Sequence, residues 1–150
     1  EGDLLGRYGL KNKEELWRTQ SELRSYRREA RRLIGEAQGN MEEAEAAGAE
    51  FLSRLRRYGI LSEDDDINDV LGLDVTDILE RRLQTVVYRN GLASTPKQAR
   101  QFIVHEHIVV DQARVSRPSK MVEANEEDKI RFDGTSPLAD DLHPVRAEGQ

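Results

Sequence analysis

Basic side chains gather in two parts of this chain, and guanidinium and ammonium groups bind phosphate well. Residues 81–117 carry seven Lys and Arg against two Asp and Glu, and residues 1–34 carry nine against six. Residues 35–80 and 118–150 are acidic, with net charges of −10 and −4. Because the whole chain has a net charge of −6, these local basic surfaces need a specific cause. We predict that a folded RNA is the ligand.

The N-terminal basic block contains five arginines within one predicted helix. Arg24, Arg28 and Arg31 stand at i, i+4 and i+7, so they share a helix face. Two acids, Glu22 and Glu29, can pair locally with this group, which leaves like charges in excess. An ion-paired, solvated face is the alternative, but the excess favours contact with phosphate. The predicted contacts are Arg24, Arg27, Arg28, Arg31 and Arg32.

His105 and His107 are the first candidates for metal binding. On a helix, i and i+2 point apart, so both could ligate one ion only in an extended segment. The third histidine, His143, lies far along the tail. Because a zinc site needs at least three protein ligands in one place, we predict a polar helix end here and no metal.

The acidic run at residues 63–66 could suggest a calcium loop. Counting from Asp64, however, Asp69 occupies the position that requires glycine, and Val75 the position that requires a bidentate Glu. We interpret the run as a solvated helix N-terminus. The chain also lacks a nucleophile elbow, a phosphate loop and a G-x-G-x-x-G motif. We therefore predict no catalytic residues, no cofactor and no enzyme activity.

The composition indicates the cellular environment of the protein. Cysteine is absent, which excludes disulfides and thiolate metal sites and fits a reducing cytosol. The first residues have no apolar run, so we expect neither a signal peptide nor a membrane span, and the lack of an initiator Met suggests processing or truncation upstream. Arg outnumbers Lys 18 to 5. A high-salt cytoplasm, where contact-range Arg geometry outlasts screened attraction, is the favoured explanation; a GC-rich genome is the alternative.

Helical patterns fill the first half of the chain. Asn12 can cap a helix that begins at Lys13 and ends near Gly35 or Gly39. A capping box opening at Asn40 predicts a second helix, from Met41 to about Tyr58. The apolar stripe assigned to the first helix comprises Leu16, Trp17, Leu23, Tyr26, Ala30, Leu33 and Ile34.

The second half reads as two helices followed by short strands. The first helix is predicted over residues 77–90, with an apolar face that includes Ile78, Leu83 and Val87. Thr95 and Pro96 then signal the start of a second helix whose backbone N–H groups could seat a phosphate. Strands are predicted at residues 108–110, 113–115 and 129–132, with an extended tail after Gly134.

These elements define an α+β fold. The expected division is a helical N-terminal region over residues 1–73, a basic module of two packed helices and a small antiparallel sheet over residues 74–133, and an extended C-terminal tail over residues 134–150. Apolar faces packed between the two helices would hold the outward cations at fixed separations, which suits recognition of a folded RNA backbone. Phe102 and Phe132 are expected in the core, so no aromatic stacking platform is predicted.

The basic module resembles the S-four, or α-L, RNA-binding domain. The resemblance rests on the basic first helix, the Gly-Leu-Ala turn, the Ser/Thr-capped helix reading Gln-Ala-Arg-Gln, the His-x-His ending and the Val-x-Val strand. Upstream, YGLKNKEELWR and LRSYRREARRL are similar to the archaeal form of small-subunit ribosomal protein four, and the acidity is similar to halophilic versions. The resemblance extends from about Leu4 to Arg146. The cysteine zinc cluster of bacterial relatives is absent.

The resemblance implies a structural, cytoplasmic protein of the small ribosomal subunit that binds ribosomal RNA early in assembly. It further implies a position near the messenger entry path, close to messenger RNA, with small-subunit protein five among its neighbours and no membrane partner. The RNA-facing positions would be Arg81, Arg82, Gln84, Thr95, Lys97, Gln98, Arg100, Gln101, His105, His107 and Arg114, and the basic pattern adds Arg89 and Arg117.

Two other functions remain as alternatives. The module could be the RNA-binding accessory part of an RNA-modifying enzyme or a ribosome quality-control factor. The charged helices could instead form a protein–protein adaptor, with the Arg24–Arg32 face binding an acidic protein. A catalytic domain would identify the first alternative, and salt-dependent partner choice would identify the second.

Overall fold

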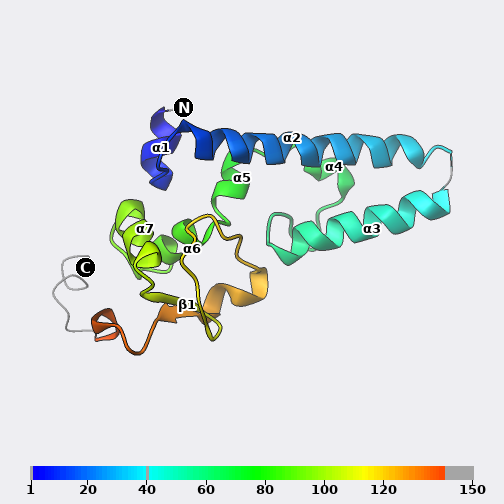
Figure 1. Cartoon of the computed structure of the whole chain (residues 1–150). Helices are drawn as coiled ribbons and strands as arrows, with labels where there is room; N and C mark the ends of the chain where they lie inside the picture. Colours follow the sequence, from blue (N-terminus) through cyan, green and yellow to red (C-terminus); the bar gives the residue numbers. More distant parts are fainter. Residues whose placement is uncertain (1, 40, 141–150) are drawn as a thin grey trace.

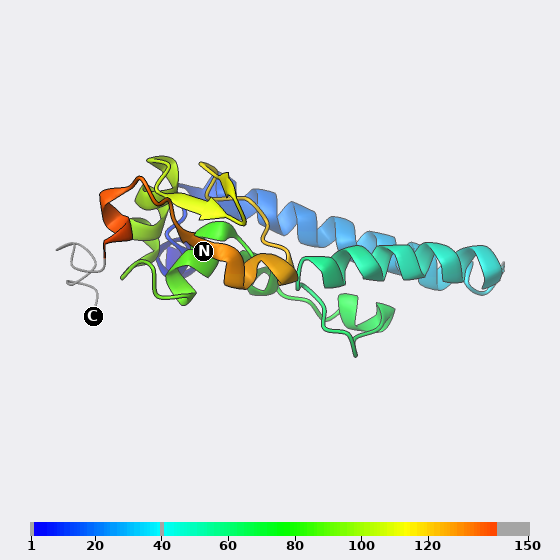
Figure 2. The ribbon, with the colours of Figure 1, turned by 90° about the horizontal axis from the view of Figure 1, so that it is seen from below.

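This protein consists of a long helical hairpin and a smaller half, the mixed half, that contains both helices and strands. The computed structural model describes residues 2–39 and 41–140. In it, α2 (Lys13–Glu36) and α3 (Met41–Arg57) lie side by side and project away from the rest of the chain (Figures 1 and 2). A short helix, α1 (Gly2–Tyr8), precedes them. The sequence pattern did not predict α1, because seven residues carry too little periodicity to reveal a helix.

Side-chain caps set the starts of two N-terminal helices where the sequence predicts them. Asn12 Oδ1 accepts a hydrogen bond from the Glu15 N–H at 3.3 Å, which caps α2. Asp66 accepts from the Asn68 and Asp69 N–H groups and caps α4 (Ile67–Val70), so the acidic run does form a helix N-terminus. The capping box predicted for α3 begins at Asn40, which lies outside the described residues.

Trp17 is the main error in the predicted apolar stripe of α2. It is 52% exposed, whereas its neighbour Leu16 is fully buried. Two consecutive helical residues point about 100° apart, so only one of them can point directly at the core. The side chains of α2 that the core does bury are Leu16, Thr19, Leu23, Ala30 and Leu33.

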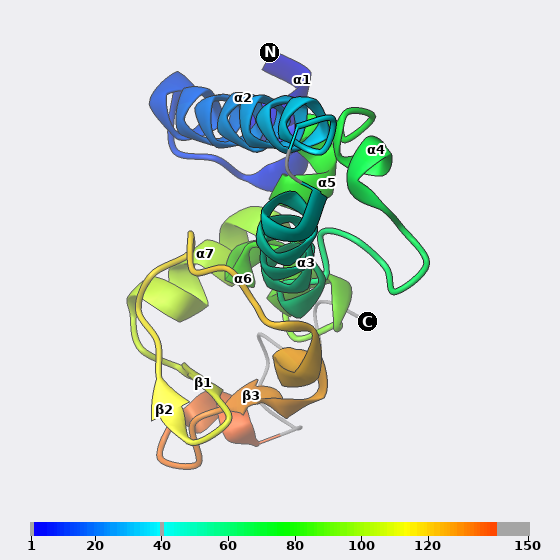
Figure 3. The ribbon, with the colours of Figure 1, turned by 90° about the vertical axis from the view of Figure 1, so that its right-hand side faces the viewer.

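Two apolar cores divide the described chain. The first is built by α1 to α5 and includes Leu23, Phe51 and Ile78. The second begins at Leu83 and includes Phe102. Figure 3, viewed nearly along α2, shows α3 and α5 beneath that helix and α4 to its side, with α6 and α7 beside α3 and the strands at the bottom.

The predicted helix over residues 77–90 is wrong, because the chain breaks it into α5 (Val75–Leu79) and α6 (Leu83–Arg89). At the break, Arg82 pairs with Met121 in an antiparallel β-bridge. The Leu83 N–H donates to the Lys120 carbonyl at 2.7 Å, and the Val122 N–H donates to the Arg81 carbonyl at 2.9 Å. These long-range bonds replace helical ones, so Ile78 and Leu83 enter different cores.

The second helix of the predicted module is present as α7 (Pro96–Val104), packed against α6. Thr95 Oγ1 accepts from the Gln98 N–H at 3.0 Å, and Pro96 occupies the first turn, as predicted. The side-chain oxygen of Gln98 accepts a hydrogen bond from the N–H of Ser94, which completes the cap. Ala99, Phe102 and Ile103 are buried, which confirms the predicted inner face.

A small antiparallel sheet of order β2-β1-β3 completes the second half and confirms the α+β class. It consists of β1 (Ile108–Val110), β2 (Ala113–Arg114) and β3 (Ile130–Phe132), with Val109 opposite both Arg114 and Arg131. The predicted strands were each up to one residue longer. A 3-10 helix, η1 (Ala124–Lys129), leads into β3.

The predicted extended tail contains a further element, η2 (Pro137–Ala139). Leu138 is 6% exposed and belongs to the second core, so the chain is anchored there. The rest of the predicted tail, residues 141–150, lies outside the described residues.

Candidate nucleic-acid interface

The predicted RNA-facing residues fall into three groups in the structure. One group is buried and holds the two cores together. A second is exposed but held by carboxylates of this chain. The third is exposed and has no acidic partner among the described residues, and its side chains are the ones available to a ligand.

A polar cluster, the Glu15 network, consists of the buried Arg82 and Gln84 and the half-buried Glu15 and Arg100. Glu15 Oε1 accepts from Arg82 Nη2 at 2.8 Å and from Arg100 Nη2 at 3.0 Å. Gln84 Oε1 accepts from Arg100 Nη1 at 3.1 Å, and Gln84 Nε2 donates to the carbonyl of Gly9 at 2.8 Å. The network therefore joins the start of α2 to both α6 and α7.

Electrostatics in the Glu15 network favour the ionised carboxylate. Burial by itself would raise the pKa of Glu15, but the hydrogen bonds from Arg82 and Arg100 outweigh it, so the pKa lies below its usual value. The Arg82 side chain is 5% exposed and that of Glu15 is 16% exposed. Because both side chains are largely shielded from water, removing either one would leave the other without a counter-ion in a poorly solvated site.

The predicted outward positions of Arg82 and Gln84 are therefore wrong. Gln84 is fully buried, and Arg82 has a buried Nε with no partner within the described ranges. The break before α6 turns both side chains inward, towards the α1–α2 corner. Neither presents a polar atom to an RNA surface in this arrangement.

Arg81 and Arg27 also act within the protein. Arg81 donates to the carbonyls of Tyr58 at 2.7 Å and Val122 at 3.0 Å, and it pairs with Glu127. Its side chain is only 12% exposed. Arg27 donates to the carbonyl of Leu73, so it points away from the surface that Arg24 and Arg28 share.

Three further arginines are exposed but paired: Arg32, Arg89 and Arg114. Arg32 bonds Glu29 and Glu36, and these bonds raise its pKa above the ordinary value. Arg89 bonds Glu80 at 3.0 Å, and Arg114 bonds Asp133 at 2.5 Å.

A shared carboxylate links α1 to the end of α5. Tyr8 Oη donates to Glu80 Oε2 at 2.7 Å. Burial and this hydrogen bond raise the pKa of Tyr8 to about 12. Burial opposes ionisation of Glu80, yet the bonds from Arg89 and Tyr8 lower its pKa overall. The Arg89 charge is thus part of an internal cluster.

The outward side of α7, called here the α7 face, consists of the exposed Lys97, Gln101 and His105 and the half-buried Gln98. Lys97 and Gln101 have no side-chain partner in the described part of the chain, and His105 makes only a ring contact with His107. His107 is half-buried, and its Nδ1 lies 2.7 Å from Ser136 Oγ. The His107 side chain therefore packs against the start of η2 and does not face outward. Arg117, in the loop after β2, is also exposed.

The predicted phosphate seat at the N-terminus of α7 is closed on one side. The turn at Gly9 (φ +60°) packs there, so a Cβ at Gly9 would lie 2.9 Å from Pro96 Cβ and 3.0 Å from the Lys97 nitrogen. Thr95 already takes the N–H of Gln98. A phosphate at this end would therefore meet the Lys97 side chain before any backbone N–H.

The other predicted RNA contacts that stay free lie on α2. Arg28 and Arg31 are exposed and have no carboxylate partner among residues 2–39 and 41–140, and Arg24 bonds only Ser21, at 2.9 Å. The five-arginine cluster predicted from the sequence thus separates into three free members and two that are occupied. The pairing of Arg32 was readable from its spacing to Glu29 and Glu36, whereas the inward turn of Arg27 had no local signal.

Sequence reasoning missed Glu15 altogether. It was assigned to the acidic first turn of a helix, and nothing near it in the chain indicates its partners, which lie 67 and 85 residues away. Only the burial of Arg82, which then needs a carboxylate partner, would have pointed to Glu15, and that burial is seen only in the structure.

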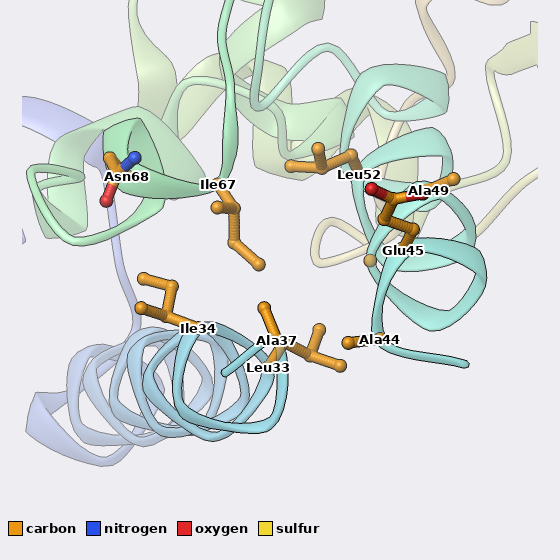
Figure 4. A pocket seen from close by; sticks show the side chains of 10 residues that line it. Leu33, Ile34, Ala37, Ala44, Glu45, Ala49, Leu52, Ile67 and Asn68 are labelled. Carbon is orange, nitrogen blue, oxygen red and sulfur yellow. The ribbon is translucent and has the colours of Figure 1, made fainter. Parts of the chain in front are cut away.

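An apolar groove opens between α2, α3 and α4, away from the α7 face. It has a volume of about 450 Å³ and is lined by aliphatic side chains such as Leu33, Leu52 and Ile67, with Glu45 and Asn68 as its polar members (Figure 4). It offers no cation to a phosphate. Among the described residues no group of three metal-ligating side chains is found, and His143 lies beyond them. No described helix is long and apolar enough to cross a membrane.

Comparisons with known proteins identify the family that the chain is similar to. Residues 81–128 match the S4 domain family. Over 150 residues the chain is 81% identical to small ribosomal subunit protein uS4 of Haloquadratum walsbyi and 70% identical to that of Natronomonas pharaonis; each alignment covers the whole chain and 86% of the relative. The uS4 protein of Methanococcus aeolicus is 49% identical over 151 residues, covering 99% of the chain and 82% of the relative.

Proposed function

The chain belongs to the uS4 family of small ribosomal subunit proteins, and from this we infer that it is a structural constituent of the small subunit that binds ribosomal RNA. Its place is then in the cytoplasm, within the ribosome, among RNA and other ribosomal proteins. It is not an enzyme. The names of the relatives favour this role over the accessory-module and adaptor alternatives, and the high-salt interpretation agrees with their halophilic sources.

One observation carries the RNA-binding part of this conclusion. Cations on α2 and on α7 stay exposed without acidic partners among residues 2–39 and 41–140, although the chain has an excess of carboxylates to neutralise them. Like charges left together on a rigid surface are unfavourable unless a polyanion meets them. We propose as RNA contacts Arg24, Arg28, Arg31, Thr95, Lys97, Gln98, Gln101, His105 and Arg117, and we assign internal roles to the buried and paired arginines.

We propose the finer details on the strength of the family resemblance. They are binding early in subunit assembly, a position near the messenger entry side, and contact with small-subunit protein five. The division into residues 1–73, 74–133 and 134–150 is likewise a proposal; the two apolar cores separate between Leu79 and Leu83, a few residues after its first boundary.

Removing Arg28 and Arg31 together tests the α2 contacts. We expect Arg28→Ala/Arg31→Ala to weaken binding to a small-subunit ribosomal RNA transcript by about tenfold per arginine, because each loses a charge-assisted phosphate contact. The slope of log affinity against log KCl should fall by about 1.4, at about 0.7 per phosphate. Filter binding over a KCl series measures both quantities.

The same helix offers a matched control. Arg18→Ala/Arg32→Ala removes equal charge, but both arginines are held by carboxylates, with Arg18 2.7 Å from Glu14. We expect little change in affinity from this control. Equal losses in the two double variants would show that only net charge matters and would remove α2 from the interface.

Lys97 tests the α7 face. We expect Lys97→Ala to weaken binding of the same transcript by about tenfold, because its ammonium is exposed and has no internal partner within the described residues. Its removal should leave the urea unfolding midpoint unchanged, since an exposed side chain without contacts contributes little stability. Unchanged affinity would mean that α7 points away from RNA. Lys129→Ala, which removes an exposed cation from η1, serves as the control.

A further inference from the structure

The outer stripe of α2 is continuous and carries no acid. It consists of Lys13, Trp17, Ser21, Arg24, Arg28 and Arg31, all exposed. Successive members are three or four residues apart, so at about 100° per residue all lie within about 40° of the Trp17 direction. From Lys13 to Arg31 the stripe extends about 27 Å, at about 1.5 Å per residue.

Packing leaves this stripe open. The helices α3, α4 and α5 all contact α2, and they lie on one side of it (Figures 1 and 3). The buried residues of α2 face them and lie about 100–160° around the helix from Trp17. The outer stripe is therefore turned away from the first core.

Three carboxylates of α2, at about 60° to 140° around the helix from Trp17, are already engaged. Glu14 holds Arg18 at 2.7 Å, Glu22 accepts from Tyr26 Oη at 2.5 Å, and Glu29 holds Arg32. The stripe cations have no such partner among the described residues, apart from the Arg24–Ser21 hydrogen bond. The surface thus combines unneutralised positive charge with one exposed indole.

An exposed indole between cations fits an unpaired nucleotide. A base stacks on an aromatic face while neighbouring guanidinium groups hold the phosphates on either side. A base inside a duplex is already stacked on its neighbours, so only a looped or single-stranded segment can present one. The aromatic rings of the second core, Phe102 and Phe132, are buried and cannot take this role.

We propose that Trp17 stacks on an unpaired base of the bound RNA, while Arg24, Arg28 and Arg31 contact the phosphates that follow along α2. This inference rests on the proposed function and adds a chemical specificity to it. The α7 face has no exposed Phe, Tyr or Trp within the described residues, and its one ring, the His105 imidazole, lies against that of His107, so this face recognises backbone shape. The two surfaces therefore read different features of the RNA.

A protein partner would use an exposed Trp differently. Tryptophan is common at the centre of protein interfaces, where a largely apolar pocket receives it. Here the neighbours along the stripe are cations and one serine, and Lys13 precedes Trp17 by one turn. That environment favours a polyanion whose planar groups can stack, which is RNA.

Trp17 is the single tryptophan of the chain, so its fluorescence reports this site alone. The probes are small-subunit ribosomal RNA, poly(A), and inorganic polyphosphate, which has the charge but no bases. We expect both RNAs to quench the emission and polyphosphate to leave it nearly unchanged at saturation. Equal quenching by polyphosphate, or none by ribosomal RNA that demonstrably binds, overturns the proposal.

Affinity gives a second measure. We expect Trp17→Leu to weaken ribosomal RNA binding about tenfold and Trp17→Phe to restore most of that loss. The salt slope should stay unchanged in both variants, because no phosphate contact is removed. A Trp17→Leu variant that binds as tightly as the original chain overturns the stacking, as does one that loses only a protein partner.

These outcomes separate the two proposals. If ribosomal RNA binds normally but does not quench the fluorescence of Trp17, the stacking is rejected and the ribosomal role stands. No RNA binding by the folded original chain would reject both. Because Trp17 is exposed, its replacement should not unfold the protein, and circular dichroism of each variant checks this.

Discussion

Glu15→Gln is expected to destabilise the protein by about 3–5 kcal/mol. The substitution keeps the side-chain shape but removes the negative charge that faces Arg82 at 2.8 Å and Arg100 at 3.0 Å. Arg82 would remain buried, with a 5% exposed side chain and no counter-ion. Urea unfolding at constant KCl measures the loss, and an unchanged slope with urea would show that the change is in stability alone.

Glu14→Gln is the matched control for this prediction. It removes a carboxylate one residue earlier, but its pair with Arg18 is exposed, at 61% and 77% for the two side chains. Exposed pairs contribute about 0–1 kcal/mol. If the two variants lose similar stability, the Glu15 network is not the connection that the geometry indicates.

The same carboxylate gives a pH dependence with a definite sign. Because the folded pKa of Glu15 is below its unfolded value, its contribution is complete above the ordinary Glu pKa, near 4.5. That contribution is lost as the pH falls through the lower, folded value. The stability difference between the original chain and Glu15→Gln should therefore shrink below about pH 4.5, and urea titrations from pH 7 to pH 3 would measure this. A constant difference would contradict the assignment.

Phe102→Ala is the second large effect, with an expected loss of about 3–5 kcal/mol. Phe102 is 6% exposed, and its ring lies 5.9 Å from that of Phe132 and 6.4 Å from that of His107. Truncation would leave a cavity where α7 meets β3. A lower urea midpoint measures the loss.

Val104→Ala, in the same helix, controls for changes in helix propensity and apolar surface. Val104 is 50% exposed, so we expect a change within about 0.5 kcal/mol. If Phe102→Ala left the urea midpoint where Val104→Ala leaves it, α7 would not be packed on the sheet as described.

Local signals predicted most of the helices and strands. Thr95 and Pro96 marked the start of α7, Asn12 capped α2, and the acidic run before Ile67 capped α4. Each of these depends on residues within four positions of one another, which a sequence shows directly. The apolar face of α7 was correct for the same reason.

Distant contacts account for the errors. The break at Arg82 depends on a β-bridge to Met121, and nothing in residues 77–90 marks it with Gly or Pro. The inward turn of Gln84 depends on the carbonyl of Gly9, 75 residues away. Trp17 was misplaced because periodicity does not decide which of two adjacent apolar residues the core accepts.

The sequence predicted the location of the candidate interface but not which of its arginines are free. Composition located both basic blocks, and the shared face of Arg24, Arg28 and Arg31 followed from helix geometry. What composition could not do was separate free arginines from occupied ones. That separation depends on acids brought close by the fold, such as Glu127 beside Arg81 and Asp133 beside Arg114.

The Glu15 network also has a consequence for how the protein loses its structure. Its carboxylate belongs to the helix that covers one apolar core, and its guanidinium groups belong to the helices of the other. Opening either half would break both ion pairs and remove the packing that shields them from water, so neither half would keep its full stability alone. The hairpin and the mixed half should therefore melt together, as one cooperative two-state transition, although each has a core of its own.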